Sequence, residues 1–340
     1  MTAQKPCYIL AIESSCDDTA AAVLKNDEVL SNRIANQAIH ADYGGVVPEL
    51  ASRAHQQNIV PVVDRALKEA GITKVELSAI AYTRGPGLLG SLLVGTSFAK
   101  SLSMALRIPL IEVNHLQGHL LSHFIRDENP LPKFPFLGIT VSGGHTQIVR
   151  VNHYFDLEEL GTTLDDAIGE AFDKCGKVMG LGYPAGPHID RLAKTGDHTA
   201  FTFPIPKVDG LNVSYSGFKT AVINFLHKNQ QKKPNFIEEN KADLCASIQH
   251  TLIEIIYAKI EMAVQTTGIK EIAIGGGVAA NSGLRNKLTQ AGEKHNWTVH
   301  LPPFAYTTDN AAMIGIVGYF KYKENAFGSL EQAATARLPI

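Results

Sequence analysis

Two histidines four residues apart are the side chains in this sequence best suited to chemistry. Residues 113–123 read VNHLQGHLLSH, and His115 and His119 would face the same side of a helix. Two imidazoles in this arrangement can bind a single metal ion, which then needs a third ligand. His123 lies four residues further on, but the two leucines before it indicate a turn into the core. We therefore expect His123 at the rim of the site rather than on the ion.

A zinc peptidase is one alternative for this helix, because the HExxH motif also places two histidines four residues apart. In that class of enzyme the glutamate beside the first histidine acts as the general base. Here the residues between the histidines are Leu116, Gln117 and Gly118, and none of them accepts a proton at neutral pH. The peptidase hypothesis therefore lacks its base. A purely structural role, in which the histidines cap or line the helix, is a further alternative.

Two glycine-rich segments could bind a nucleotide. The segment SGGHT (142–146) separates two predicted strands, and GGGVAAN (275–281) separates a predicted strand from a helix. Glycine lets the backbone approach phosphates closely, and the amides at the start of a helix point at anions. Neither segment matches the P-loop pattern or GxGxxG. We therefore expect a nucleotide site outside those two classes, with a pair of tight turns as the alternative.

Several aspartates lie at positions where strands end or helices begin. Asp17 and Asp18 follow the first predicted strand, Asp173 and Asp190 lie in the second half of the chain, and Asp309 lies at the start of the last predicted helix. Each could simply cap a helix or carry a solvated charge. Asp309 is of interest because its carboxylate could complete the two-histidine set. The residues identify no general base, and Asp17 is the one candidate for a catalytic residue.

The composition is that of a globular protein with two domains. A chain of 340 residues is long enough for two domains of roughly 150 residues each. The 31 basic and 33 acidic residues give a net charge of -2, so nucleic-acid binding would need a local basic patch or a partner. The four cysteines are widely separated and include no CxxC pair, which argues against a disulfide framework and against a thiolate zinc site.

We expect a cytoplasmic protein without a membrane segment. The N-terminal segment MTAQKPCYILAIESSC contains a short apolar run broken by Glu13, which is not typical of a signal peptide. The longest apolar stretches contain Gly, Ser or charged residues well within about 18 residues, the length that a transmembrane helix needs.

The elements that must position these side chains alternate between strands and helices. In the first half, strands are predicted at 7–15, 19–26, 28–36, 77–85 and 109–115. Helices are predicted at 46–70 and at 88–106, and the second of these is largely apolar and therefore expected to be well buried. The proline-rich segment NPLPKFP (129–135) is typical of a domain boundary.

The same layout then restarts in the second half. A strand, a tight glycine turn and a second strand at 135–152 repeat the pattern of residues 8–26. Helices are predicted at 167–181, 187–195, 215–228, 241–267 and 309–323. A strand, glycine loop and helix are predicted at 269–292, and a further strand at 297–303. This order predicts an α/β protein with a duplicated, two-lobed fold, a central cleft, and ligands on the loops at strand ends. The predicted lobes are 1–130 plus 305–340 and 131–304.

A set of longer motifs occurs in order along the chain. They are IESSCDDTAAAV, RGPGLLGSLLVG, NHLQGHLLSH, VSGGHTQ, GEAFDKCGK, YPAGP, YSGFKTAV, GGGVAANSGLR and TDNAAMIG. In these motifs, from about residue 8 to about residue 325, the chain resembles the tRNA N6-adenosine threonylcarbamoyltransferase family, once labelled O-sialoglycoprotein endopeptidase. The resemblance implies the two-lobed actin/sugar-kinase/Hsp70-like ATPase fold.

The resemblance also implies roles for individual residues. His115, His119 and Asp309 match the family's metal ligands, and the implied cofactor is one divalent ion per subunit, Fe²⁺ or Zn²⁺. The positions that match substrate-binding residues are Thr140, Val141, Ser142, Gly143, Gly144, Asp173, Gly186, Asp190 and Asn281. The chain departs from the family pattern at Ala185, where glycine is common, and has Cys175 and Gly176 at variable positions.

The activity implied by the resemblance is transfer of a threonylcarbamoyl group from threonylcarbamoyl-adenylate to N6 of the adenosine beside the anticodon (position 37). The substrate would be tRNAs that read codons starting with A, and AMP would leave. The implied protein partners are a paralogous subunit and a small ATPase, with the helices at 46–70 and 88–106 as candidate interfaces. The candidate RNA-binding lysines are Lys207, Lys219, Lys228, Lys232, Lys233, Lys321 and Lys323. A metal-dependent peptidase and a small-molecule kinase of the same superfamily remain alternatives.

Overall fold

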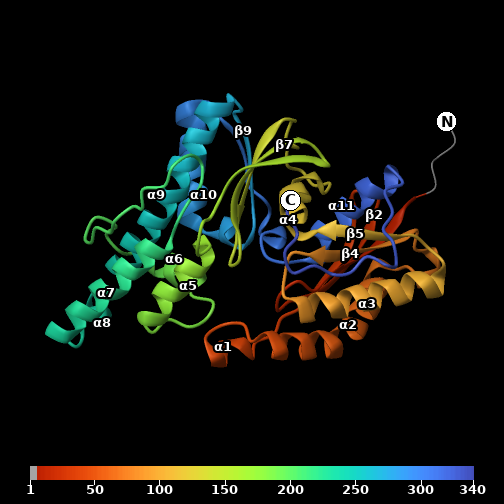
Figure 1. Ribbon diagram of the computed structural model, residues 1–340, viewed down its shortest axis with the longest axis horizontal. Coiled ribbons are helices and arrows are strands. Elements are labelled where there is room, and N and C mark those ends of the chain that lie inside the picture. Colours follow the sequence, from red (N-terminus) through yellow and green to blue (C-terminus); the bar gives the residue numbers. More distant parts are fainter. Residues whose placement is uncertain (1–5) are drawn as a thin grey trace. The chain divides into compact units, whose positions relative to one another are not determined.

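The computed structural model describes residues 6–340, which form two compact units (Figure 1). Unit 1 contains the described residues up to Leu131 together with Thr308–Ile340, and unit 2 is Pro132–Thr307. The chain thus passes from one unit to the other inside the proline-rich segment 129–135. The first five residues of the predicted first lobe, which also begin the segment judged unlike a signal peptide, lie outside the described residues.

Unit 1 is built on a five-stranded sheet with the order β3-β2-β1-β4-β5. Its strands are β1 (Tyr8–Glu13), β2 (Thr19–Lys25), β3 (Glu28–Ala35), β4 (Ala79–Gly85) and β5 (Leu110–Asn114). The first three strands pair antiparallel, whereas β1, β4 and β5 run parallel. The carboxyl ends of these three neighbouring parallel strands therefore lie at the same edge of the sheet.

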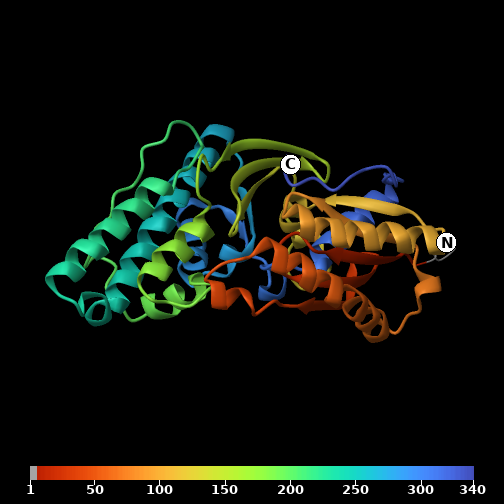
Figure 2. The ribbon, with the colours of Figure 1, turned by 60° about the horizontal axis from the view of Figure 1, so that its bottom comes forward.

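Helices cover both faces of this sheet. They are α1 (His40–Tyr43), α2 (Pro48–Ala70), α3 (Leu89–Leu106), α4 (His115–Leu121) and α11 (Ala311–Lys323). Helices α2 and α3 pack side by side (Figure 2) and share a core with Leu10 and Ile80. Neighbouring residues in these strands point the other way, and Ala81 meets α11 at Gly318. The C-terminal helix is therefore an integral layer of unit 1.

Unit 2 repeats this topology in a second five-stranded sheet. Its strands are β6 (Phe136–Val141), β7 (Thr146–His153), β8 (Asp156–Thr162), β9 (Glu271–Gly275) and β10 (Thr298–His300). The order β8-β7-β6-β9-β10 matches β3-β2-β1-β4-β5, with antiparallel pairing among β6, β7 and β8 and parallel pairing from β6 to β9 and β10. The predicted duplicated α/β fold is confirmed.

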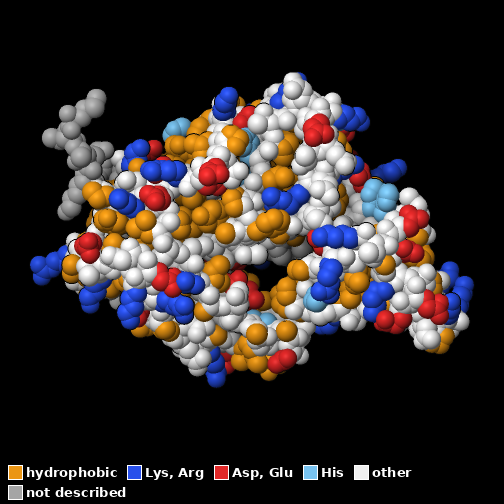
Figure 3. All heavy atoms as spheres, turned by 180° about the vertical axis from the view of Figure 1, so that it is seen from behind, with side chains coloured by type: hydrophobic (Ala, Val, Ile, Leu, Met, Phe, Trp, Pro, Cys, Tyr) orange, Lys and Arg blue, Asp and Glu red, His pale blue; other side chains and the backbone are white. Residues whose placement is uncertain are grey.

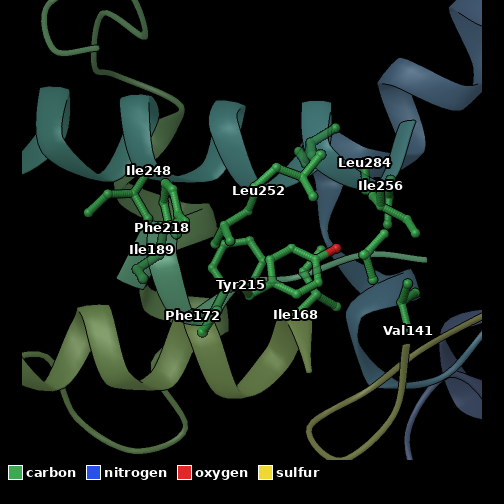
Figure 4. Packing of buried hydrophobic residues seen from close by; sticks show 14 of the residues in the cluster. Val141, Ile168, Phe172, Ile189, Tyr215, Phe218, Ile248, Leu252, Ile256 and Leu284 are labelled. Carbon is green, nitrogen blue, oxygen red and sulfur yellow. The ribbon is translucent and has the colours of Figure 1, made fainter. Parts of the chain in front are cut away.

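The core of unit 2 lies between its sheet and a group of helices. These are α5 (Ile168–Val178), α6 (Gly186–Ala193), α7 (Ser216–Lys232), α8 (Phe236–Glu239), α9 (Lys241–Thr267) and α10 (Ser282–His295). Figure 4 shows Phe172, Tyr215 and Leu252 close together in this core, and all three are buried. The predicted glycine loop after β9 contains a short 3-10 helix, Gly277–Ala280, before α10 begins.

The prediction that the apolar helix at 88–106 is well buried is wrong for one of its faces. Only one face of α3 packs on α2 and the sheet, while Leu89, Leu93 and Met104 are 49%, 47% and 62% exposed. Among the described residues, α3 is the helix whose length and composition would also allow a membrane crossing, with 33% of it buried. A core helix of a globular domain also meets this criterion of length and composition.

Close packing of α11 on the sheet gives a first prediction. A Cβ atom at Gly318 would lie 2.6 Å from the Cβ of Ala81, closer than real Cβ contacts. We expect Gly318→Val to lower the free energy of unfolding by about 1–3 kcal/mol, because overpacking displaces α11. Chemical denaturation measures the effect. Gly217→Ala is the control, since the nearest atom to its added Cβ is 4.0 Å away; equal stability of both variants would contradict the packing argument.

Candidate metal centre

The end of β5 presents the two histidines. The strand stops at Asn114, whose side-chain oxygen accepts hydrogen bonds from the backbone N–H groups of Leu116 (2.9 Å) and Gln117 (3.4 Å). This N-cap starts α4 directly at the strand end. His115 and His119 therefore lie on the first and second turns of a short buried helix.

Asp309 reaches the histidines from the other end of the chain. It precedes Asn310, which caps α11 by accepting a hydrogen bond from the backbone N–H of Met313 at 3.1 Å. Helix α11 packs against α4 as well as against the sheet. The start of α11 is thereby fixed beside the histidines, although almost two hundred residues of sequence separate them.

The three predicted ligands come together in unit 1. Nε2 of His115 lies 3.4 Å from Oδ1 of Asp309, and Nε2 of His119 lies 3.2 Å from the same oxygen. One ligand atom from each side chain falls within 4.8 Å of the others. The imidazole rings stand nearly perpendicular, at 89°, with centroids 4.7 Å apart. Both rings thus direct Nε2 toward a single carboxylate oxygen.

The chemistry of this group fits a metal ion. His119 is fully buried, and neither of its ring nitrogens forms a well-directed hydrogen bond among the described residues, although Nε2 lies 3.2 Å from Oδ1 of Asp309. Burying an imidazole without partners is costly, and a bound cation would satisfy Nε2. Two imidazoles and one carboxylate suit Zn²⁺ or Fe²⁺ better than Mg²⁺ or Ca²⁺, and three protein ligands leave a position open for substrate.

The charges around the site are strongly interdependent. Burial disfavours the charged form of His115, but the carboxylates of Asp309 and Glu13 outweigh it and raise the pKa of His115 well above its usual range. Burial lowers the pKa of His119. Burial also disfavours the charged form of Asp309, but the two histidines hold the pKa of this carboxyl below its usual range. The cluster is therefore suited to holding positive charge next to Asp309.

Glu13 is a residue of this site that the sequence alone did not indicate. It ends β1, is completely buried, and lies with Oε2 3.0 Å from Nδ1 of His115. Oε2 also accepts a hydrogen bond from the hydroxyl of Thr83 at 2.6 Å, and Oε1 accepts one from the backbone N–H of Ser15. A glutamate at the end of an apolar strand was the available signal, because carboxylates are rarely buried without a partner.

The acidic pair after β1 lies close to the same edge. Asp17 is half-buried, and its assignment as a catalytic candidate stays a prediction. Asp18 accepts a hydrogen bond from the side chain of Asn36 at 2.7 Å. Burial, followed by the carboxylates of Asp309 and Asp17, raises the pKa of Asp18 to about 7.

In unit 2 the two glycine-rich segments lie against each other at the ends of the parallel strands β6 and β9. Thr140 and Val141 end β6, and Ser142 closes a tight turn in which its N–H donates to the carbonyl of His145 at 2.8 Å. Gly276 has φ of 96°, and a Cβ there would lie 2.4 Å from the carbonyl oxygen of Val141. Only glycine permits this approach, so the second loop supports the first.

Gly143 and Gly144 lie at the tip of that turn. A Cβ at either position would meet no described heavy atom within 4 Å, so their backbones are open to a ligand. The turn is further held by Gly169 at the start of α5, whose N–H donates to the carbonyl of Ser142 at 3.1 Å. The geometry is compatible with anion binding, and substrate binding by these residues stays a prediction.

The other predicted substrate residues make internal hydrogen bonds. Oδ1 of Asp173 accepts from the N–H of Ala185 at 2.7 Å, next to Gly186. Oδ1 of Asp190 accepts from the N–H and the hydroxyl of Ser282 at 3.1 and 2.8 Å. Asn281 caps α10 by accepting from Leu284 N–H at 3.0 Å and donates to Gln249 at 2.7 Å. These contacts shape the loops, and their roles toward a substrate stay predictions.

The departure from the family pattern at Ala185 has a structural counterpart. A Cβ at Gly176 would lie 2.2 Å from the Cβ of Ala185. The missing side chain at one position therefore leaves room for the methyl group at the other. The loop keeps its hydrogen bond to Asp173 with alanine in place.

Residues 28–316 match the family described as tRNA N6-adenosine threonylcarbamoyltransferase. The chain belongs to this family. It is 61% identical over 330 residues to the tRNA N6-adenosine threonylcarbamoyltransferase of Christiangramia forsetii, covering 97% of each chain. It is 58% identical over 337 residues to that of Riemerella anatipestifer, covering 99% of each. The family predicted from the motifs is confirmed, and the protein is a transferase that acts in tRNA modification.

Solved structures that resemble the chain support the fold of the threonylcarbamoyltransferase family. Full-length HypF in its phosphate- and nucleotide-bound form matches with a TM-score of 0.61 at 14% identity, covering 95% of this chain and 47% of HypF. Component A of the (R)-2-hydroxyglutaryl-CoA dehydratase of Acidaminococcus fermentans matches with a TM-score of 0.53 at 16% identity, covering 94% and 99%. At these identities the likeness concerns the fold alone.

The raised pKa of Asp18 gives a prediction for the metal-free protein. We expect its carboxyl to titrate with a midpoint of about 7, against about 3.9 in an unfolded chain. At a pH between these two values, the Asp18 carboxyl is ionised in the unfolded chain but still protonated in the folded chain. The free energy of unfolding should therefore fall as the pH rises through this window.

Asp18→Asn removes this titrating group, so the free energy of unfolding of the variant should depend less on pH between about 4 and about 7 than that of the unchanged protein. Urea unfolding across that range and carboxyl ¹³C NMR of the metal-free protein measure the two effects. Asp64→Asn is the control, because Asp64 is exposed on α2 and pairs with Lys68. A midpoint near 4 for Asp18 would contradict the role assigned to its buried, acidic surroundings.

Proposed function

We propose that this chain transfers the threonylcarbamoyl group of threonylcarbamoyl-adenylate to N6 of the adenosine at position 37 of tRNAs reading codons that start with A. AMP is released, and the reaction takes place in the cytoplasm. Family membership supports the transfer to tRNA adenosine. The observation that carries the proposal for this chain is the convergence of His115 and His119 on Asp309.

The chemical difficulty of this reaction explains why such a group is useful. The amine of adenine is a weak nucleophile, because its lone pair is delocalised into the ring. The acyl donor must therefore be polarised and held close to the amine. A divalent ion would act as a Lewis acid on the carbamoyl or phosphate oxygens. One such ion per subunit, Fe²⁺ or Zn²⁺, is the proposed cofactor.

Residues of this chain are proposed for metal binding, nucleotide binding and proton transfer. His115, His119 and Asp309 would hold the ion, which would supply Lewis-acid chemistry beside the donor. The backbone amides around Gly143 and Gly144 would bind the AMP half, since a Cβ at either glycine would meet no heavy atom within 4 Å outside the adjoining residues. Asp17 and Asp18 are the acidic groups nearest in sequence to Glu13, and Asp17 is the candidate for proton transfer.

The proposed macromolecular partners are tRNA, a paralogous subunit and a small ATPase. The exposed apolar side chains Leu89, Leu93 and Met104 on α3, and Val60 on α2, make these two helices candidate protein interfaces. These are the two helices that the sequence suggested for this role. Exposed apolar side chains favour a protein partner over solvent.

The lysines proposed to contact RNA differ in availability. Lys219 forms an ion pair with Asp166 at 2.5 Å, and Lys321 donates to the carbonyl of Glu112 at 2.8 Å, so both are occupied internally. Lys207, Lys228 and Lys232 are exposed. On the face seen in Figure 3, basic and acidic side chains are intermixed. This distribution favours sharing of the tRNA with partner subunits.

Reconstitution tests the proposal directly. The protein is incubated with tRNA, threonylcarbamoyl-adenylate and the partner subunits, and threonylcarbamoyladenosine is measured by mass spectrometry of digested tRNA. Modification of adenosine with stoichiometric release of AMP supports the proposal. Hydrolysis of a peptide substrate, or phosphorylation of a small molecule without tRNA modification, would favour the alternative activities.

Loss of a metal ligand should stop the transfer. We expect His115→Ala and Asp309→Ala to lower the initial rate at least about a hundredfold, because Lewis-acid stabilisation is worth several kcal/mol. Metal content measured by mass spectrometry should fall in parallel. His123→Ala is the control, since it lies beyond the end of α4 and outside the converging group. Full transfer by either ligand variant would remove the ion from the mechanism.

A further inference from the structure

A buried carboxylate, Glu13, contacts one of the candidate metal ligands. Glu13 has no exposed surface, and Oε2 lies 3.0 Å from Nδ1 of His115, on the opposite side of the ring from Asp309. The two contacts use different ring nitrogens, since Nε2 of His115 faces Asp309. A chain of contacts therefore runs from Thr83 through Glu13 and His115 to Asp309.

We propose that Glu13 is a positioning residue that fixes the tautomer and orientation of His115 for metal binding. It accepts a hydrogen bond from Nδ1–H and so leaves the lone pair of Nε2 directed at the ion. This inference rests on the metal site of the proposed function and adds to it a residue that does not touch the ion.

The hydrogen bonds of Glu13 determine which nitrogen of His115 carries the proton. Oε1 accepts from the backbone N–H of Ser15, and Oε2 accepts from the hydroxyl of Thr83 at 2.6 Å. Both oxygens are thus already acceptors. A bare Nδ1 at 3.0 Å from Oε2 would place two acceptors against each other, so Nδ1 must carry a proton, and Nε2 is the nitrogen left for an ion.

Ser15 provides a second neighbour of the same nitrogen, with Oγ 3.2 Å from Nδ1. A hydroxyl can donate or accept, so it is compatible with either tautomer and cannot select one. The carboxylate of Glu13, which can only accept, is therefore the group that determines the tautomer of His115. Such carboxylate–histidine–metal arrangements also raise the basicity of the ligand nitrogen, and losing the outer partner costs about 10–100-fold in metal affinity.

Glu13→Gln is a sharp test because the amide cannot satisfy all of these donors. If its oxygen accepts from Ser15 N–H, its NH₂ group faces Nδ1 and requires the opposite tautomer, with the proton on Nε2. If its oxygen faces Nδ1–H, the NH₂ group meets the N–H of Ser15. The first orientation disfavours the metal-binding tautomer of His115, and the second loses the hydrogen bond from Ser15 N–H that holds the side chain in place. The size of the side chain is preserved in both.

The first measurement is the affinity for Zn²⁺, determined by competition with a chelator of known affinity. We expect Glu13→Gln to bind about 10–100-fold more weakly than the unchanged protein. Glu112→Gln is the matched control, since Glu112 is a partly buried glutamate on β5 that pairs with Arg84 at 3.1 Å instead of a histidine. Its Zn²⁺ affinity should remain within about twofold of that of the unchanged protein, well short of the loss expected when an outer-shell partner is removed.

The second measurement is the tautomer of the neutral His115 ring in the metal-free protein, read from the ¹⁵N NMR shifts of its ring nitrogens at a pH above the raised pKa of this side chain. The unchanged protein should carry the proton on Nδ1, and Glu13→Gln should move population to Nε2–H. A residue needed only for folding would not shift this equilibrium. Wild-type affinity in Glu13→Gln, or an unchanged tautomer, would overturn the proposal.

A second variant keeps the test decisive if Glu13→Gln does not fold. Thr83→Val removes only the hydroxyl that holds Oε2 and should weaken Zn²⁺ binding in the same direction but less. Unaltered affinity in Thr83→Val would then contradict the proposal. Failure of the unchanged protein to bind Zn²⁺ at all would instead refute the metal site of the proposed function, so the two ideas fail in distinguishable ways.

Discussion

The parallel alignment of β1, β4 and β5 is the constraint on which the rest of the site depends. Parallel neighbours place their carboxyl ends at one edge of the sheet, and the segments that follow must begin there. Glu13 and Thr83 therefore come within hydrogen-bonding distance, and α4 starts beside them with His115. Helix α11 packs across the same sheet and brings Asp309 to that edge. A slip of one strand by one residue would turn these side chains to the other face.

The same architecture occurs twice in the chain but is used in two ways. In unit 1 the strand ends supply side chains that converge on one point. In unit 2 the corresponding ends of β6 and β9 supply backbone, and the close approach of Gly276 to Val141 supports an open turn. Side chains such as Asp190 and Asn281 are occupied in capping α10 and anchoring its start. Duplication of a sheet thus produced one edge that presents ligand atoms and one that presents amides.

Much of this arrangement follows from local patterns in the sequence. Apolar runs, glycine turns and the repeat of the first strands predicted the duplicated α/β fold, and four-residue spacing predicted that both histidines face one way. The parts that were missed depend on register between distant segments. The pairing of Glu13 with His115 depends on the order β1-β4-β5, which brings the ends of these strands to one edge of the sheet, and no local pattern encodes that order. The exposure of one face of α3 was missed because the abundance of apolar residues in a helix does not reveal which of its faces the rest of the protein covers.

The central claim is that Nε2 of His115, Nε2 of His119 and a carboxylate oxygen of Asp309 bind one ion. Anomalous diffraction at the metal absorption edge, from crystals of the metal-loaded protein, tests this most directly. We expect a single strong peak in unit 1 with two nitrogen ligands and one oxygen ligand at about 2.0–2.2 Å. A peak at other residues, or coordination through Nδ1 of His115, would contradict it.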